Sequence, residues 1–192
     1  MNFDAENFKA WNDLVKQFGD AYCYNEFLIA LRSAKAISEV GKDIAEKNEN
    51  IKSQYHLLFP AIEASLNYSL TLSVCHFFDL PSERRKEELR SIPFFLNQLN
   101  DKMKKKEFGL LKKNNMDTID KLRYARNNFF AHRTVDRVTM PCLLQNRKLL
   151  DDLNKFINSI GYRQAPARWN NINGIKKDFN NLLVDLIYNK AK

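Results

Sequence analysis

An arginine and a histidine stand six positions apart in the stretch LRYARNNFFAHR, residues 122–133. Arg126 carries a permanent charge on a planar fork of N–H donors, which suits it to hold a phosphate. A histidine ordinarily titrates near neutral pH, so His132 can move protons at an attacking or leaving oxygen. Together they suit RNA cleavage, in which a 2′-OH attacks the adjacent phosphate and charge builds up in the transition state. Neither role requires a metal ion, and no carboxylate cluster suggests one, so we expect no metal and no cofactor.

The position of Arg126 on its predicted helix is unusual. On a helical wheel with Ile119 at zero, Leu122 lies at about 300° and Phe129 at about 280°, so these residues define an apolar stripe. Arg126 falls inside that stripe, at about 340°. A charge on a core-facing stripe destabilises the fold unless it is paired or opens into a cleft. We therefore expect Arg126 either to pair with a buried acid, such as Glu63, or to line a functional cleft.

His132 falls on another side of the same helix, at about 220° and about 9 Å further along the axis. One straight helix therefore cannot present both side chains to one substrate. The helix could unwind near Ala131 and turn His132 inward. Alternatively, two copies of the helix could meet across a two-fold axis and share a groove. His132 could also serve only as a cap at the helix C-terminus, where a cation is favoured.

The complete string carries a family resemblance. RNNFFAHR resembles the signature of the HEPN superfamily, in which an arginine and a following polar residue precede a histidine by a short helical interval. The Ala-His-Arg ending resembles the abortive-infection branch of that superfamily, as does the upstream stretch SLTLSVCHFFDLPSERRKEELRSIPFFLNQL. The motif match covers about eight residues, and a looser pattern match covers residues 20–160.

The resemblance implies a fold and a function. HEPN proteins are all-α, commonly homodimeric, and many are metal-independent endoribonucleases of toxin–antitoxin systems or phage defence. It implies that Arg126 and His132 are catalytic, that Asn127 assists them, and that both motifs meet in a dimer cleft. RNA is then the substrate, and an antitoxin protein is a further partner. The alternative is a non-catalytic module that binds RNA, a nucleotide or a protein, as other members of the superfamily do.

One position departs from a branch of the family. In toxins that a partner nucleotidyltransferase silences, a tyrosine commonly follows the histidine by two residues. Thr134 stands at that position here. The resemblance therefore does not extend to that mode of control.

Basic residues near the motif are candidate substrate contacts. The formal net charge is +8 and the sequence pI is about 9.3, which favours an anionic partner. Arg133 and Arg137 follow the histidine directly and are expected to touch substrate phosphates. Lys104, Lys105 and Lys106 belong to the stretch DKMKKKEFGLLKK, which could feed RNA to the cleft. The same stretch could instead be a solvated connection between helices.

Helical periodicity extends over most of the chain. With five glycines and five prolines in 192 residues, the chain has few turn-formers, which favours long helices. We expect an all-α, HEPN-like up-and-down bundle with additional terminal helices, built as one domain over residues 1–192. Pro60 is expected to kink its helix or to lie in the first turn, and Asn115 or Asp117 to cap the motif helix. The expected helices cover residues 4–18, 20–47, 50–78, 91–104, 117–133, 142–160 and 173–189.

The remaining residues with reactive side chains suggest no second site. His76 lies in an apolar run, where a core histidine with one hydrogen bond is expected. Cys23, Cys75 and Cys142 are far apart and lack the spacing of a disulfide framework or a zinc site, which favours a reducing cytosol. The N-terminus lacks the pattern of a secretory signal, and polar residues interrupt the apolar stretch 66–80. We therefore expect a cytoplasmic protein that does not span a membrane.

Overall fold

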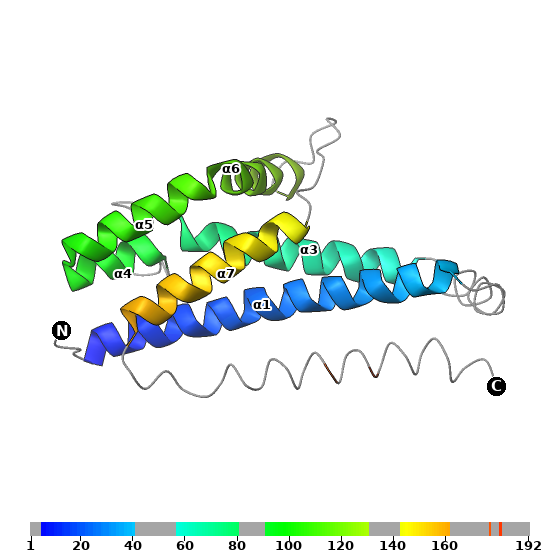
Figure 1. Ribbon diagram of the computed structural model, residues 1–192, viewed down its shortest axis with the longest axis horizontal. Helices are drawn as coiled ribbons and strands as arrows, with labels where there is room; N and C mark the ends of the chain where they lie inside the picture. The colour runs from blue at the N-terminus through cyan, green and yellow to red at the C-terminus, as the bar shows by residue number, and fades with distance from the viewer. Residues whose placement is uncertain are drawn as a thin grey trace.

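Helices make up the described chain. The computed structural model describes residues 5–40, 57–80, 91–130, 143–161, 177 and 181. No strand occurs within these ranges, which confirms the all-α prediction for them. The elements shown in Figure 1 are α1 (Ala5–Val40), α3 (Leu58–Phe77), α4 (Ile92–Leu99), α5 (Lys102–Asn114), α6 (Met116–Tyr124), the π-helix η1 (Ala125–Phe130) and α7 (Leu143–Ile160).

The two longest helices of this set, α1 and α3, lie side by side and antiparallel (Figure 1). Near the start of α1, Gln17 Nε2 donates a hydrogen bond to the carbonyl oxygen of Ser73 at 3.1 Å. Further along, Arg32 Nε donates to Glu63 Oε1 at 3.2 Å. The early part of α1 therefore adjoins the late part of α3. This pair supports the end of α3, where the candidate site lies.

Helix α1 is continuous through Gly19, so the prediction of two helices, 4–18 and 20–47, is wrong at this point. A glycine in a helix interior costs about 1 kcal/mol relative to alanine. Val15, Phe18 and Ala21 on both sides of Gly19 are buried in the same core. Burial of these side chains outweighs the local preference, because tertiary packing supplies most of the stability of a helix in a protein.

Helix α3 begins with Leu58, and Pro60 lies in its first turn. Of the two roles expected for Pro60, the first-turn role is therefore confirmed. A proline is tolerated there because the N–H groups of the first turn have no partner within the helix. Val74 and Phe77 near the end of α3 are buried, as is Phe78 directly after it, and the ring of Phe77 lies 6.2 Å from that of Phe18.

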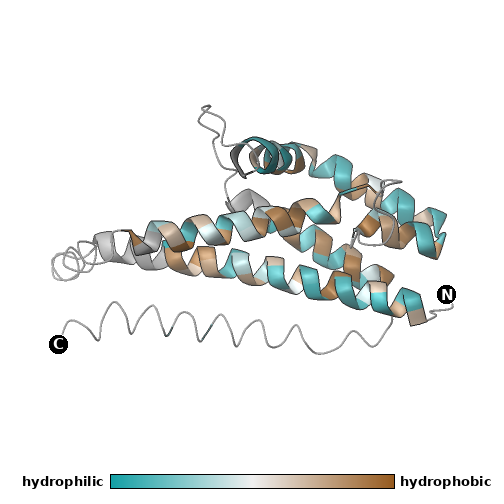
Figure 2. Cartoon of the chain, turned by 180° about the vertical axis from the view of Figure 1, so that it is seen from behind, coloured by the Kyte–Doolittle hydropathy of each residue, from teal (hydrophilic) through white to brown (hydrophobic). Residues whose placement is uncertain are grey.

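The lysine-rich stretch forms the helix α5, so its reading as a connection is wrong. The predicted helix 91–104 ends at Leu99, because Asn100 takes a left-handed conformation with φ 50° and ψ 30°. Asp101 then starts α5 by accepting a hydrogen bond from the Lys104 amide at 3.0 Å. A side-chain acceptor at this position satisfies a backbone N–H that the first helical turn leaves without a partner. Hydrophilic residues (teal in Figure 2) cover much of α5.

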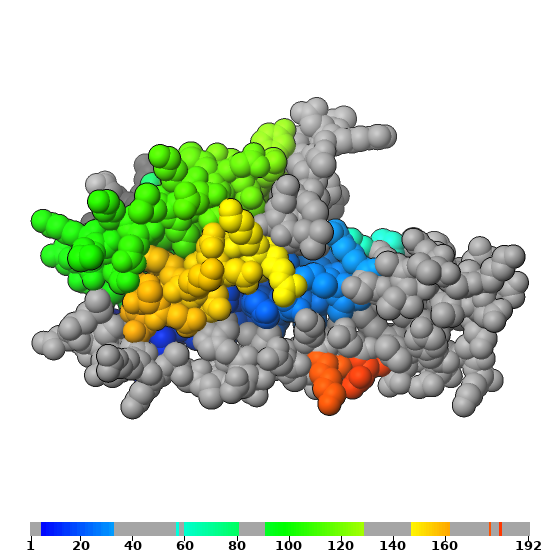
Figure 3. Space-filling view, viewed as in Figure 1, coloured from blue at the N-terminus to red at the C-terminus, as the bar shows by residue number. Residues whose placement is uncertain are grey.

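One buried aromatic side chain anchors α5 to the core. Phe108 stacks on Phe78 with ring centroids 5.6 Å apart and contacts Phe156 of α7 at 5.3 Å. The predicted helix 142–160 is observed as α7, which lies over α1 and beside α5 (Figure 3). The core cluster also contains Trp11, Leu14, Leu28, Leu70, Ile92, Phe95, Leu96, Ile119, Leu122, Leu149, Leu153 and Ile157.

The junction of α5 and α6 differs from the predicted cap. Asn115 occupies the N-cap position of α6, but its side chain makes no capping bond. Its Nδ2 instead donates to the Leu111 carbonyl at 3.0 Å and to Asp152 Oδ2 at 2.9 Å, which ties the junction to α7. Asp117 pairs with Lys121 at 2.7 Å on the surface. Both candidate caps therefore make other contacts than the predicted one.

The structure describes only two residues of the predicted C-terminal helix. Of the helix expected over 173–189, Lys177 and Asn181 are described, and both are helical. Across the described ranges, no helix combines the length and the apolar composition needed to cross a bilayer.

Candidate functional site

The helix of the RNNFF motif changes its winding where the motif begins. Helix α6 ends at Tyr124, and the π-helix η1 covers Ala125–Phe130, including Arg126 and Asn127. A π-turn contains one residue more than an α-turn, so the following side chains point in other directions than the α-helical wheel predicts. Such turns are rare and frequently lie at functional sites. Unwinding was expected near Ala131, which lies outside the described residues, and the change observed starts six positions earlier.

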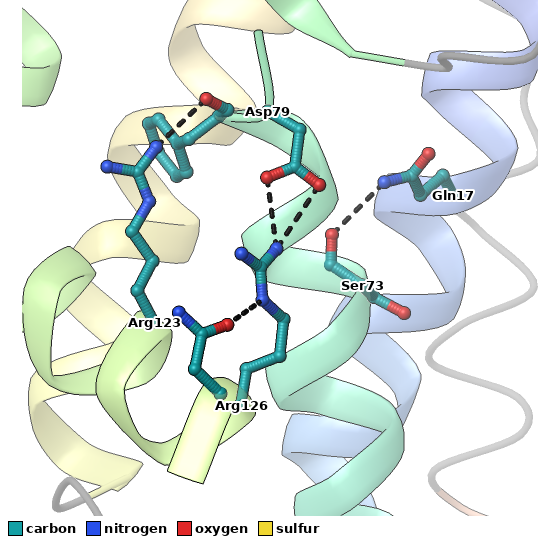
Figure 4. A network of polar contacts seen from close by, with 7 residues as sticks. Gln17, Ser73, Asp79, Arg123 and Arg126 are labelled. Atoms are coloured by element: carbon teal, nitrogen blue, oxygen red, sulfur yellow. Dashed lines mark hydrogen bonds and ion pairs between the residues drawn. The ribbon is translucent and has the colours of Figure 1, made fainter. Parts of the chain in front are cut away.

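Arg126 forms an ion pair with Asp79, the second residue after the end of α3 (Figure 4). Its Nη1 lies 3.0 Å from Oδ1 and 3.2 Å from Oδ2 of Asp79. The two side chains are 26% and 25% exposed, so the pair lies at the edge of the core. A charge inside an apolar stripe needs such a partner, as expected. The named candidate partner was wrong: Glu63 pairs with Arg32, because it lies in the first half of α3 beside α1.

Asn127 contacts the same guanidinium from a second side. Arg126 Nε donates a hydrogen bond to Asn127 Oδ1 at 3.1 Å. The accepting atom must be the amide oxygen, because arginine has only donors. Asn127 is exposed to solvent. The third nitrogen, Arg126 Nη2, donates no hydrogen bond to any described residue, and two of its N–H bonds stay available to a ligand.

A second arginine binds the end of α3 one turn earlier. Arg123 Nη2 donates to the carbonyl oxygen of Phe78 at 3.0 Å. Phe78 caps the C-terminus of α3, where carbonyl groups lack helical partners and carry partial negative charge. A cation is therefore favoured there. Figure 4 shows Arg123 and Arg126 directed at this end of α3 from neighbouring turns, so two positive charges lie near the C-terminus of α3.

A buried thiol lies close to these charges. Burial raises the pKa of the Cys75 thiol to about 11, and the nearby charge of Arg126 partly opposes this. A thiol with this pKa stays protonated at neutral pH and is a poor nucleophile. Cys75 therefore acts as part of the packing beneath the arginines. Cys23 and Cys75 are both free thiols, which agrees with the prediction that they form no disulfide.

The prediction of a core histidine at position 76 is wrong. His76 is exposed on the last turn of α3, although both of its neighbours, Cys75 and Phe77, are buried. Successive helical residues point about 100° apart. In this turn the side chains of Cys75 and Phe77 point into the core, and the side chain of His76 points away from it. An apolar sequence neighbourhood does not by itself bury every side chain in it.

The structure places some of the predicted site residues and leaves others outside its ranges. Arg126 and Asn127 are in contact. His132, Arg133 and Arg137 lie outside the described residues. The predicted meeting of Arg126 with His132 therefore stays a prediction.

The three predicted substrate lysines lie on the first turns of α5. Lys104 Nζ is engaged with Glu107 at 2.7 Å and with Ser159 at 3.3 Å. Lys105 and Lys106 are exposed. The helix from Lys105 to the end of α5 is about 14 Å long, and all of α6 separates that end from Arg126. These lysines therefore lie apart from Arg123 and Arg126.

Asp79 and Arg123 were not predicted as site residues. The pairing of Asp79 with Arg126 joins positions 47 residues apart, and nothing in their spacing indicates a contact. The proximity of Arg123 to Arg126, one helical turn away, was the available signal for that residue.

The described residues contain no group of three or more His, Cys, Asp or Glu side chains arranged to hold a metal ion. Compared with known proteins, the chain matches no family model, no curated protein and no solved structure.

Proposed function

We propose that the protein is a metal-independent endoribonuclease of the HEPN type that works as a homodimer. In this proposal Arg126 holds the scissile phosphate, His132 moves a proton, and Asn127 assists them in a cleft that two chains share. The observation that carries the proposal is the state of Arg126: Asp79 and Asn127 hold its guanidinium in a π-helical turn, and Nη2 is left available. The resemblance of RNNFFAHR to the HEPN signature supports the same residues.

The proposed reaction is a transesterification within the RNA. The 2′-oxygen forms a bond to phosphorus, and the bond from phosphorus to the 5′-oxygen breaks. The proton of the 2′-OH goes to a base, and the departing 5′-oxygen receives one from an acid. His132 can serve in either role because a histidine side chain ordinarily exchanges protons near neutral pH, and a shared cleft supplies two copies of it. Arg126 stabilises the additional negative charge on the phosphorane oxygens.

We place this activity in a toxin–antitoxin or phage-defence system of the cytoplasm, with an antitoxin protein as a partner. The resemblance to the abortive-infection branch supports this placement. The basic character of the chain supports an RNA substrate, because positive charge draws in polyanions.

The decisive test is cleavage of a mixed RNA pool, once with EDTA and once with magnesium. The wild type should cut in both conditions. Arg126→Ala and His132→Ala should each lower the rate about 100-fold or more, because each removes a group that acts in the transition state. Arg32→Ala is the matched control, since it removes an arginine from another ion pair, 3.2 Å from Glu63. That variant should cut like the wild type.

A mixing experiment tests the shared cleft. Arg126→Ala and His132→Ala protomers, combined under conditions that exchange subunits, should recover part of the lost activity, because one cleft then contains an intact copy of each residue. Absence of recovery would contradict the shared site. Wild-type protein that binds RNA without cutting it in either condition would support the non-catalytic alternative instead.

A further inference from the structure

The contacts of Arg126 determine how it can receive a phosphate. A guanidinium offers two edges for bidentate binding, Nε with Nη2 and Nη1 with Nη2. Asn127 Oδ1 occupies Nε at 3.1 Å, and Asp79 occupies Nη1 at 3.0 and 3.2 Å. Each edge therefore has one nitrogen engaged, and both share Nη2. Nη1 carries a second N–H, but a phosphate on the Nη1–Nη2 edge would lie beside the Asp79 carboxylate, which would repel it. Bidentate binding of a phosphate therefore requires that Asn127 or Asp79 is displaced.

The two displacements differ in energy. The bond to Asp79 joins two opposite charges that are each about three-quarters buried, and breaking it would leave a carboxylate at the core edge without its partner. The bond to Asn127 joins the guanidinium to a neutral amide oxygen on an exposed side chain, which water can solvate. Hydrogen bonds between two charged groups are also stronger than those with one neutral partner. The edge that Asn127 occupies therefore opens more easily.

We propose that the substrate phosphodiester binds the Nε–Nη2 edge of Arg126 by displacing Asn127 Oδ1, while Asp79 stays on Nη1. The proposal rests on the proposed function, because it states how Arg126 holds the phosphate. In the free protein, Asn127 Oδ1 then accepts the Nε–H bond that a phosphate oxygen accepts in the complex. Asp79 is a positioning residue that fixes the opposite edge of the guanidinium.

The proposal assigns a second role to Asn127 after displacement. Its amide carries donors on Nδ2 as well as the acceptor on Oδ1. Once the oxygen leaves Nε, rotation of the side chain can direct Nδ2 at the bound phosphate. An asparagine can thus accept from the arginine in the free protein and donate to the ligand in the complex. Aspartate cannot do this, because its carboxylate only accepts at neutral pH.

The test observes the Nε–H of Arg126 directly by NMR, with a 2′-O-methyl RNA octamer as the probe. This probe lacks the attacking 2′-OH, so binding is observed without cleavage. The resonance is identified by its absence in Arg126→Lys. Addition of the octamer should shift it to saturation in the wild type and in Asp79→Asn. Asn127→Asp should weaken binding roughly tenfold or more, because a carboxylate holds the edge and repels the phosphate.

A kinetic measurement tests Asp79 as a positioning residue. Asp79→Asn should lower kcat on unmodified RNA and leave KM within about threefold, because a loosened arginine stabilises the transition state less well than it binds the ground state. Glu63→Gln makes the same chemical change in the Arg32 ion pair and should leave both constants unchanged. Equal loss of kcat in both variants would reduce Asp79 to a structural role and contradict its assignment.

The outcomes separate this inference from the proposed function. If the octamer binds through Arg126 and the Nε–H does not move, the phosphate takes the other edge and the inference is overturned alone. If Arg126→Ala binds the octamer as tightly as the wild type, Arg126 does not hold the phosphate, and both fail. A shift of the resonance in a protein that cuts no RNA would support the binding edge and contradict the catalytic function.

Discussion

At the level of single residues, Arg126 shows how a partly buried charge obtains its hydrogen-bond partners. The α-helical pattern predicts it on an apolar stripe, and its partly buried position in η1 would be unfavourable for an unpaired charge. The partners come from two directions: Asp79 from the end of α3, and Asn127 from the adjacent position. The same side chain keeps one nitrogen available to solvent or ligand. A site residue can thus be partly buried, paired and still able to bind.

Gly161 provides a stability prediction at this scale. A Cβ built at Gly161 would lie 2.5 Å from Trp11 Nε1 and 2.6 Å from its Cζ2, and Trp11 is only 1% exposed. Gly161→Ala should lower the free energy of unfolding by about 1–3 kcal/mol, because the rigid indole must shift within the core. Urea unfolding followed by circular dichroism measures this.

The control is Gly109→Ala, on the exposed side of α5. A Cβ there meets nothing within 4 Å, so this variant should be as stable as the wild type or more so. Equal destabilisation of both variants would show that the contact with Trp11 is not the cause.

At the scale of elements, the winding of a helix decides where its side chains point. The winding changes from α6 to η1 at Ala125, so the α-helical wheel applies up to Tyr124 and does not apply within η1. Ile119 and Leu122, which precede the change, are buried as the wheel predicts. A wheel therefore predicts burial well within a regular helix and loses its meaning across a π-turn.

Gly19 provides a prediction on the length of an element. It lies inside α1, and a Cβ there meets nothing within 4 Å. Gly19→Ala should raise the free energy of unfolding by about 0.5–1 kcal/mol, since it adds helix propensity without a clash. Thermal unfolding measures the gain. Gly19→Pro is the opposing variant, and it should cost about 3 kcal/mol or more by breaking the continuous helix. A stable proline variant would contradict the continuity of α1 at this point.

At the scale of the whole molecule, a row of contacting aromatic rings connects the site to the core. Phe108 contacts both Phe78 and Phe156, so α3, α5 and α7 meet next to the carbonyl group that Arg123 binds. The arginines are therefore presented by a packed scaffold. The positive charge of the molecule is spread more widely, with the exposed lysines of α5 at a distance from the arginines.

This separation leads to a prediction on salt dependence. If RNA extends from the arginines to α5, the double variant Lys105→Ala/Lys106→Ala should reduce the slope of log Kd against log salt by about 1.4, as expected for two lost phosphate contacts on a single strand. Fluorescence anisotropy with labelled RNA at several salt concentrations measures the slope. Lys104→Ala is the control, because Lys104 is engaged with Glu107 and Ser159, and it should leave the slope unchanged. An unchanged slope in the double variant would place the RNA elsewhere.

The sequence predictions were accurate for features that local patterns determine and failed for features that depend on contacts between distant residues. Helices with a clear apolar stripe, such as 142–160, were predicted nearly to the residue, because their pattern is local. The end at Leu99 and the helix α5 were missed, because a left-handed Asn100 and a single anchor, Phe108, decide them. His76 was misplaced because its exposure depends on which face of one turn meets the core.

Local patterns predicted the all-α class, the need of Arg126 for a partner and the position of Asn127 beside it, because periodicity and neighbouring positions can be read along the chain. The identity of the partner, Asp79 and not Glu63, and the place of Arg123 beside Arg126 at the end of α3 could not be read from these patterns. These contacts depend on the packing of α6 and η1 against α3. Two residues that are 47 positions apart meet only after the core has brought their helices together.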